Sequence, residues 1–326
     1  MAFRCVRKFQ KREGNMQIPI VLASDENYAP YMATAMQSVM ENANKEQKYV
    51  FIILHKGLSE EIQEKLKLQV AAYSCFSIEF INLSPEFKNF SNMKYIGSWT
   101  VEIYFRLITP WLLKEFDKII YMDCDIVCNC DISGIYGIGM GNNLIAGAPD
   151  TPQVSINNNP KYKGIFRSSV IGKMAQPENY INSGFIIMNL KEFRNRFTSD
   201  YLLNLAENSK YNFPDQDLLN YIAKDSVFIL SQEFNFLNTN WDISHAPKNL
   251  IDEYNKAREN PKIIHYTTAK PWKVELPPPF FHLFWKYSTR TPFIDSIISS
   301  MTEKQLIGQS AKKFFIKVLK RKLTEK

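Results

Sequence analysis

The sequence IPIVLASDEN, residues 18–27, joins a short apolar run to an abrupt polar end, a pattern typical of a buried strand that leads into a loop. Residues 31–39 follow with apolar side chains three and four apart, which favours a helix. The alternation continues through residues 49–54, 59–72 and 77–83 as strand, helix and strand. Strands that alternate with helices predict a largely parallel sheet covered by helices on both faces.

The later chain is less regular but fits the same kind of sheet. Residues 151–176 are rich in Asn, Gly, Ser and Lys and show little periodicity, which predicts a long polar loop that acts as a lid. No internal repeat is visible, so we predict one α/β domain of the Rossmann-like type. We expect further strands at residues 118–122, 144–148 and 185–189, and helices at residues 200–207 and 216–223.

The charge is concentrated at the two ends of the chain. The net charge is +7, yet residues 1–15 carry five Lys and Arg against one Glu, and residues 310–326 carry seven against one. The body between them is nearly neutral. Because nucleic-acid-binding proteins build positive charge into a folded face, we expect no nucleic-acid partner. The predicted division is a basic extension at 1–15, one domain at 16–285 and a basic helical tail at 286–326.

The tail has a second pattern. Apolar residues at positions 311, 314, 315, 318, 319 and 323 fall on one helical face, and lysines and Arg321 occupy much of the remainder. A basic amphipathic helix of this kind lies in the interface of an anionic membrane. The alternative is a helix packed on the protein's own core.

Cysteine usage and hydropathy bear on location. The five cysteines are an odd count, and Cys124, Cys128 and Cys130 lie within seven residues without a nearby histidine. That spacing suits neither a disulfide framework nor a four-ligand zinc site, so we expect a reducing compartment. No apolar run approaches the roughly 20 residues that span a bilayer, and residues 1–15 lack the apolar core of a secretory signal. We predict a cytoplasmic protein, peripheral on the inner face of the cell membrane.

The sharpest chemical motif is Asp123-Cys124-Asp125, which follows the apolar residues 118–122. Residues i and i+2 of an extended backbone point to the same side, so the strand end would present two carboxylates together. Hard oxygen ligands of this kind bind Mn²⁺ or Mg²⁺ and leave positions open for diphosphate oxygens. The alternative is an ordinary polar turn.

His265 supports the metal interpretation. It ends a second apolar run, and a neutral imidazole favours Mn²⁺ over Mg²⁺. Lys270, five residues on, could neutralise phosphate charge as a point cation. A structural histidine beside an exposed lysine is the alternative. A third polar group is Asn182-Ser183-Gly184 together with Asp215-Gln216-Asp217, where Asp215 is predicted to cap a helix.

Taken together, these motifs resemble the retaining family-8 glycosyltransferases, which include bacterial lipopolysaccharide galactosyl- and glucosyltransferases and glycogenin. The resemblance runs from about Ile18 to Trp272. It rests on five ordered blocks, each weak alone: residues 23–28, residues 104–107, residues 123–125, residues 182–185, and residues 215–217 with His265 and residues 270–272.

The resemblance implies a fold of the GT-A type, a UDP-hexose donor, Mn²⁺ as cofactor and a saccharide or lipid-linked saccharide acceptor. It also implies residue roles. Asp123, Asp125 and His265 would hold the metal. Ala23, Asp25, Asn27 and Tyr28 would line the uridine pocket, with Cys124 inside the metal motif, Arg106 near the sugar and Lys270 at the leaving group. Asn182, Asp215 and Gln216 would surround the transferred sugar, and Asp150 would lie near the acceptor.

One departure from the family pattern concerns residues 267–269. The spacing from His265 to Lys270 is one residue shorter than in relatives and lacks a glycine, which puts backbone contacts to phosphate in doubt. The predicted activity is transfer of galactose or glucose in cell-surface glycan synthesis, by a front-face reaction rather than a double displacement. The alternatives are glycogenin-like self-glucosylation, a metal-dependent nucleotide-sugar hydrolase and a binding module without activity.

Overall fold

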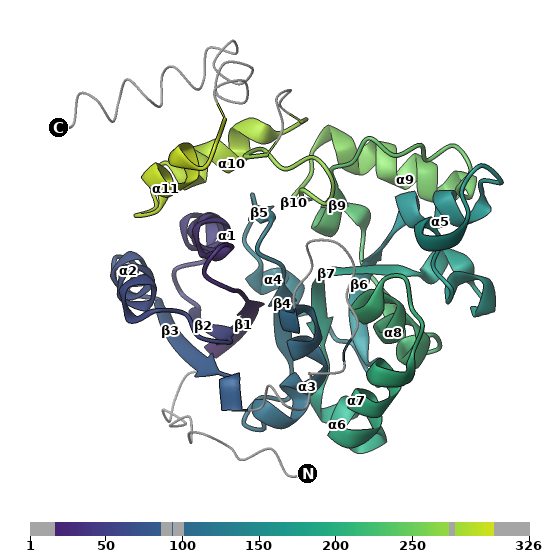
Figure 1. Ribbon diagram of the computed structural model, residues 1–326, viewed down its shortest axis with the longest axis horizontal. Helices are drawn as coiled ribbons and strands as arrows, with labels where there is room; N and C mark the ends of the chain where they lie inside the picture. The colour runs from purple at the N-terminus through teal and green to yellow at the C-terminus, as the bar shows by residue number, and fades with distance from the viewer. Residues whose placement is uncertain (1–16, 86–92, 94–100, 274–277, 303–326) are drawn as a thin grey trace.

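The structure is a computed structural model, which describes residues 17–85, 93, 101–273 and 278–302 (Figure 1). Its centre is a seven-stranded sheet in the order β3-β2-β1-β4-β7-β6-β8. Neighbouring strands are parallel except at β7, which runs antiparallel to β4 and β6. The strands are β1 Gln17–Ala23, β2 Lys48–His55, β3 Phe76–Asn82, β4 Ile119–Met122, β6 Ile145–Pro149, β7 Ile181–Met188 and β8 Val227–Ile229.

Helices cover both faces of this sheet because alternate residues of each strand point to opposite sides. On β2, Phe51 and Ile53 pack toward α1 and α2, whereas Ile52 and Leu54 pack toward α3, α6, α7 and α8. The prediction of a mostly parallel sheet covered on both faces is therefore confirmed. The helices are α1 Ala29–Asn42, α2 Glu60–Ala71, α3 Phe105–Leu112, α4 Ser133–Tyr136, α6 Leu190–Arg196, α7 Ser199–Asn208 and α8 Pro214–Ala223.

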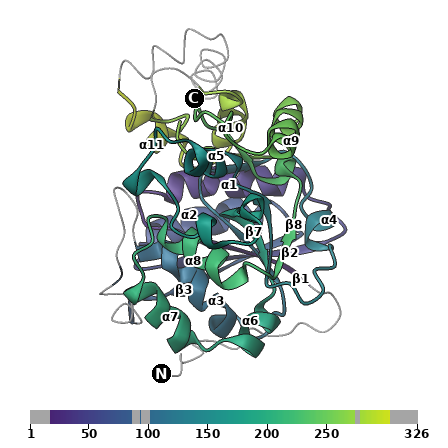
Figure 2. The ribbon, with the colours of Figure 1, turned by 90° about the vertical axis from the view of Figure 1, so that its right-hand side faces the viewer.

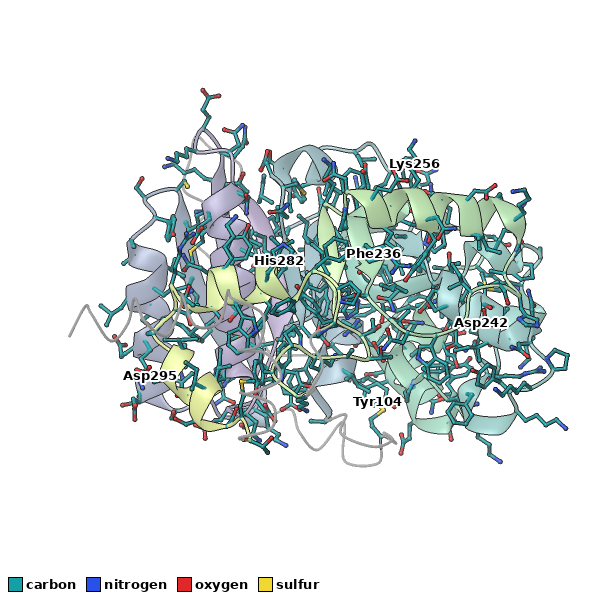
Figure 3. The ribbon with its side chains drawn as sticks, turned by 90° about the horizontal axis from the view of Figure 1, so that it is seen from above. Tyr104, Phe236, Asp242, Lys256, His282 and Asp295 are labelled. Atoms are coloured by element: carbon teal, nitrogen blue, oxygen red, sulfur yellow. The ribbon has the colours of Figure 1, made fainter. Side chains whose placement is uncertain are left out.

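A second, three-stranded sheet has the order β5-β10-β9, and its strands are Ile126–Cys128, Ile263–His265 and Phe236–Leu237. A separate apolar cluster joins it to α1, α10 (Phe281–Ser288) and α11 (Ile294–Ser299). Within that cluster Tyr31 stacks on Trp272 with ring centroids 4.0 Å apart. Figure 3 shows α11, with Asp295, at one side of the molecule and α9 (Lys248–Glu259), with Lys256, at the other.

The segment predicted to be a long loop contains helix α5, Thr151–Asn158, so that prediction was wrong over these residues. Asp150 caps the helix, because its Oδ1 accepts a hydrogen bond from Gln153 N at 2.9 Å. Residues 151–156 are all buried, and the polar side chains of Thr151, Gln153 and Ser155 among them hide the helical period. Short 3₁₀ turns follow at Gly164–Phe166, Ile171–Lys173 and Pro177–Asn179, and another lies at Gln232–Asn235.

In Figure 2, α5, α9 and α10 lie above the sheet, and α6 and α7 lie below it.

Two predictions concern the ends of the chain. Residues 1–15 and 310–326 lie outside the described residues, and so the extension and the amphipathic tail stay predictions. Helix α10 continues across the boundary predicted at residue 285, and the division into domains stays a prediction too. Among the described residues, no helix combines the length and the apolar character that crossing a membrane requires.

Candidate active site

The carboxyl ends of β1 and β4 open into a cavity of about 600 Å³. In parallel sheets ligands bind at this edge. Ala23 ends β1, and Asp123 directly follows β4. Every residue that the sequence proposed for the site lines this one cavity: Ala23, Asp25, Asn27, Tyr28, Arg106, Asp123, Cys124, Asp125, Asp150, Asn182, Asp215, Gln216, His265 and Lys270.

Two strand pairings bring the proposed metal ligands together. The Asp123 amide donates to the carbonyl of Gly184 at 2.7 Å, which continues the pairing of β4 with β7. Strand β10 pairs with β5 so that His265 lies opposite Ile126, and Tyr266 N donates to Asp125 O at 3.0 Å. As a result, oxygen atoms of Asp123 and Asp125 and a ring nitrogen of His265 all lie within 4.8 Å of one another.

Hydrogen bonds to Asn182 identify the histidine tautomer. Asn182 Nδ2 donates to Asp150 and Gln216, and Asn182 Oδ1 accepts from the Gly184 amide at 3.0 Å. Asn182 Oδ1 is therefore an acceptor for His265 Nδ1–H at 3.1 Å. With the proton on Nδ1 alone, the ring would present the Nε2 lone pair toward Asp125 Oδ1 at 3.1 Å and Asp123 Oδ2 at 3.9 Å. Three electron-pair donors that face one another fit a divalent cation, and Asn182 holds the ring as an outer partner.

The glycine between these residues makes room for the imidazole. A Cβ atom at Gly184 would lie 2.2 Å from His265 Cε1 and 2.6 Å from His265 Nδ1. Such separations are far below van der Waals contact. The ring of His265 therefore packs directly on the backbone of β7, and only glycine allows this approach.

Arg106 holds the acidic side of the cavity together. Its guanidinium is almost fully buried and pairs with Asp123 Oδ1 at 2.8 Å and with Asp215 Oδ2 at 3.2 Å. Burial raises the pKa of Asp123, although Arg106 opposes this shift. The predicted cap role of Asp215 was wrong. Helix α8 begins at Pro214, so Asp215 lies inside the first turn of the helix. Its carboxylate forms an ion pair with Arg106 instead of capping the helix.

Lys270 reaches the cavity despite the shortened spacing in the sequence. Its Nζ pairs with Asp125 Oδ2, and it also donates to the carbonyls of Tyr266 and Thr267. Burial would raise the pKa of Asp125, but the Lys270 ammonium outweighs it and holds this pKa well below its usual range. Asp125 is therefore ionised at neutral pH.

A network of buried amides forms the floor of the cavity. Gln216 Oε1 accepts from Asn182 Nδ2 at 3.0 Å and from Ser183 N at 3.1 Å. Gln216 Nε2 donates to Asp150 Oδ2 at 3.0 Å and to Tyr180 Oη at 3.2 Å. Burial raises the pKa of Asp150, while these donors oppose the shift. Because all four of its hydrogen-bonding positions are engaged, the Gln216 amide is held in one orientation.

The opposite end of the cavity is formed by the loop after β1. Asp25 Oδ1 accepts from Tyr28 N at 2.8 Å, which fixes the turn that begins α1. Cys124 Sγ donates to the carbonyl of Ala23 at 3.2 Å and so ties this loop to the metal motif. Burial raises the pKa of Cys124 well above its usual value and keeps it a neutral thiol. The Tyr28 ring contacts Tyr31 edge-on with centroids 5.5 Å apart.

Sequence reasoning gave no role to several other residues that line the cavity. Glu102 lies one helical turn before Arg106, and its place beside a quoted block was the available signal. Ser183 lies inside the block 182–185, and Thr267 lies in the stretch 267–269 that departs from the family pattern. No motif in the sequence around Trp241 indicated that it lines the cavity. Its ring packs against Tyr162 and Phe166, with centroids 5.5 and 6.1 Å away, at the side of the cavity near α5.

This fold and site are those of a glycosyltransferase with a Rossmann-like, GT-A type domain. The profile of the family described as Glycosyl transferase family 8 matches residues 19–275. The chain therefore belongs to glycosyltransferase family 8, and it is an enzyme of that class.

Curated relatives agree with the family. A putative glycosyltransferase of Haemophilus influenzae is 29% identical over 71% of this chain and 67% of its own. A lipopolysaccharide 1,2-glucosyltransferase of Escherichia coli K12 is 28% identical over 53% of this chain and 50% of its own, so the match spans about half of that relative. A lipopolysaccharide 1,3-galactosyltransferase of Salmonella typhimurium is 20% identical over 88% of this chain and 82% of its own.

Solved structures agree with the fold. The galactosyltransferase LgtC in complex with donor and acceptor sugar analogs has a TM-score of 0.68 at 24% identity, over 84% of this chain and 96% of its own. The bifunctional glycosyltransferase WbbM has a TM-score of 0.78 at 23% identity, over 89% of this chain but only 52% of its own.

Proposed function

We propose that the protein transfers a hexose, galactose or glucose, from a UDP-sugar to a saccharide acceptor and retains the anomeric configuration. The observation that carries this proposal is the convergence of Asp123, Asp125 and the Nε2 lone pair of His265 at the strand ends of a nucleotide-binding fold. These three residues would hold Mn²⁺, with Mg²⁺ as the other candidate. When bound, the ion would supply positive charge to the diphosphate leaving group as a Lewis acid.

The remaining roles are those that the family resemblance implies, and their residues all line the cavity. Lys270 adds a cation beside Asp125 and would assist the departing UDP. The uridine would lie at the end formed by Ala23, Asp25, Asn27 and Tyr28. The transferred sugar would lie among Arg106, Asn182, Asp215 and Gln216, and Asp150 would lie near the acceptor.

A front-face reaction suits these side chains better than a double displacement. A double displacement needs a free nucleophile beneath the sugar. Gln216 is an amide, and its oxygen already accepts two hydrogen bonds. Asp215 is paired with Arg106, which lowers the nucleophilicity of its carboxylate. We infer that Gln216 orients the sugar and that the acceptor enters on the side of the leaving group.

The lipopolysaccharide enzymes of Escherichia coli and Salmonella typhimurium support a place in lipopolysaccharide, lipooligosaccharide or other cell-surface glycan synthesis. A lipid-linked acceptor would suit a tail, residues 310–326, that binds the anionic inner face of the cell membrane. The tail lies outside the described residues, and this part of the proposal rests on its sequence alone.

A donor screen tests the proposal. Purified protein with Mn²⁺ is given UDP-galactose or UDP-glucose, with and without saccharide acceptors, and UDP release is measured. Acceptor-dependent release is the expected result. Equal release without acceptor would identify a nucleotide-sugar hydrolase, and a hexose-sized mass gain on the protein would identify self-glucosylation. Release from neither donor would contradict the proposal.

A further inference from the structure

Glu102 is a buried carboxylate in the wall of the cavity. It lies in the 3₁₀ turn η2, Val101–Tyr104, which leads directly into α3. Tyr104, at the end of that turn, is labelled in Figure 3. The Glu102 side chain is 5% exposed, and it lines the same cavity as the metal motif. Both of its oxygens, Oε1 and Oε2, are buried without a hydrogen-bond partner in the described part of the chain.

This contrasts with the other carboxylates of the cavity. Asp123 and Asp215 pair with Arg106, and Asp125 pairs with Lys270. Asp150 accepts from the side-chain amides of Asn182 and Gln216 and from a backbone amide. Native structures leave few buried polar groups unpaired, because such a group loses its hydration without compensation. Glu102 therefore has unused acceptor capacity in the wall of the cavity.

The nearest cation in the sequence does not serve Glu102. Arg106 lies one turn further along the chain, but its donors reach elsewhere. Arg106 Nε donates to Ile103 O at 3.1 Å and Nη1 donates to Ser183 O at 2.8 Å. It also forms ion pairs with Asp123 and Asp215, and its guanidinium lies over the Tyr121 ring. The guanidinium therefore binds residues around the proposed sugar position and donates no hydrogen bond to Glu102.

We propose that Glu102 accepts hydrogen bonds from hydroxyl groups of the transferred hexose and so selects the donor sugar. This inference rests on the proposed function. A carboxylate only accepts hydrogen bonds, and its two oxygens can receive two neighbouring hydroxyls. The diphosphate is an anion and would be repelled by it. Glu102 is not among the side chains that converge on the proposed metal position.

The position along the cavity favours the sugar over the base. Glu102 in η2 and Arg106 in α3 lie four residues apart across the junction of the two elements, and both line the cavity. Arg106 contacts Asp123, Ser183 and Asp215, whereas the proposed uridine end lies at residues 23–28. A site that hydrogen-bonds a substrate hydroxyl strongly rejects an analogue without it, since its own polar group is then left unpaired.

The test combines binding and stability. Wild type, Glu102→Gln and Glu102→Leu are titrated by calorimetry with UDP and with each UDP-hexose in the presence of Mn²⁺, and thermal unfolding is followed without ligand. For Glu102→Leu we expect affinity for the preferred UDP-hexose to fall about ten- to hundredfold, which is typical for lost hydrogen bonds to a charged group. Affinity for UDP should stay unchanged. The unfolding temperature should rise, because a buried polar group without a hydrogen-bond partner is removed.

Glu115 provides the matched control. It is also partly buried, its Oε1 has no hydrogen-bond partner among the described residues, and it is not one of the residues that line the cavity. Glu115→Gln should bind UDP and UDP-hexose as wild type does.

Three outcomes would overturn the inference. They are unchanged UDP-hexose binding in Glu102→Leu, an equal loss for UDP and UDP-hexose, and a lower unfolding temperature in both Glu102 variants, which would indicate a structural partner. Wild type that binds neither UDP-hexose would instead refute the proposed function, and this inference with it.

Discussion

Replacing Gly184 by alanine tests how His265 is held. The new Cβ would lie 2.2 Å from His265 Cε1, 2.6 Å from His265 Nδ1 and 3.0 Å from Asn182 Oδ1. Carbon atoms in contact lie about 3.5–4.0 Å apart, so the ring must move by more than about 1 Å or the strand must shift. Metal sites hold ligand distances to within about 0.2 Å. The substitution therefore removes the Nε2 lone pair from the proposed metal position.

The expected loss is large but specific. A misplacement of about 1 Å costs roughly a hundredfold in rate, and loss of an outer partner such as Asn182 costs roughly 10- to 100-fold in metal affinity. We expect Gly184→Ala to lower both Mn²⁺ affinity, measured by electron paramagnetic resonance titration, and kcat/KM for UDP-hexose by about a hundredfold. Near-ultraviolet circular dichroism checks that the variant is folded.

Gly134→Ala is the matched control, because a Cβ at Gly134 meets nothing within 4 Å and the residue lies in helix α4. It should keep wild-type metal affinity and rate. A folded Gly184→Ala variant with wild-type Mn²⁺ affinity would refute the steric reasoning.

Three further changes have defined outcomes. Asp125→Asn should abolish most UDP release in the donor screen while the thermal unfolding temperature stays near wild type, and retained activity would contradict its role as a ligand. Arg106→Met leaves Asp123 and Asp215 without their shared cation and should lower the free energy of unfolding by about 3 kcal/mol in urea titrations; an unchanged value would show that the pairs are not stabilising. Deletion of residues 310–326 should release the protein from anionic vesicles at low salt in co-sedimentation, and equal binding by both forms would refute the membrane role.

The sequence predicted the parallel half of the sheet because local periodicity records which faces of an element are buried. Residues 18–23 and 49–54 read as buried strands and are found as β1 and β2, parallel neighbours in the sheet. The site residues were also found in one place, since the carboxyl ends of parallel strands meet at one edge. Helix α5 was missed, because Thr151, Gln153 and Ser155 among its buried residues are polar and gave no apolar periodicity.

Long-range pairing was beyond local patterns. The sequence around His265 does not indicate that β10 pairs antiparallel with β5, which directly follows Asp123-Cys124-Asp125. The apolar run before His265 and the family resemblance singled it out as a candidate ligand, whereas the need for glycine at position 184 emerges only once the imidazole is seen against the strand. Asp217 shows the same limit. Asp217 is fully buried and accepts a hydrogen bond from Tyr180 Oη at 2.7 Å. Tyr180 Oη in turn accepts a hydrogen bond from Gln216 Nε2, so Asp217 helps to orient the Gln216 amide through Tyr180.

The position of the metal is the central claim, and anomalous diffraction measures it directly. Crystals grown with UDP and Mn²⁺ should show one anomalous peak within coordination distance of the carboxylates of Asp123 and Asp125 and of Nε2 of His265, with diphosphate oxygens completing the site. Bound UDP without Mn²⁺ at these three residues, or a peak at another place in the cavity, would contradict the account.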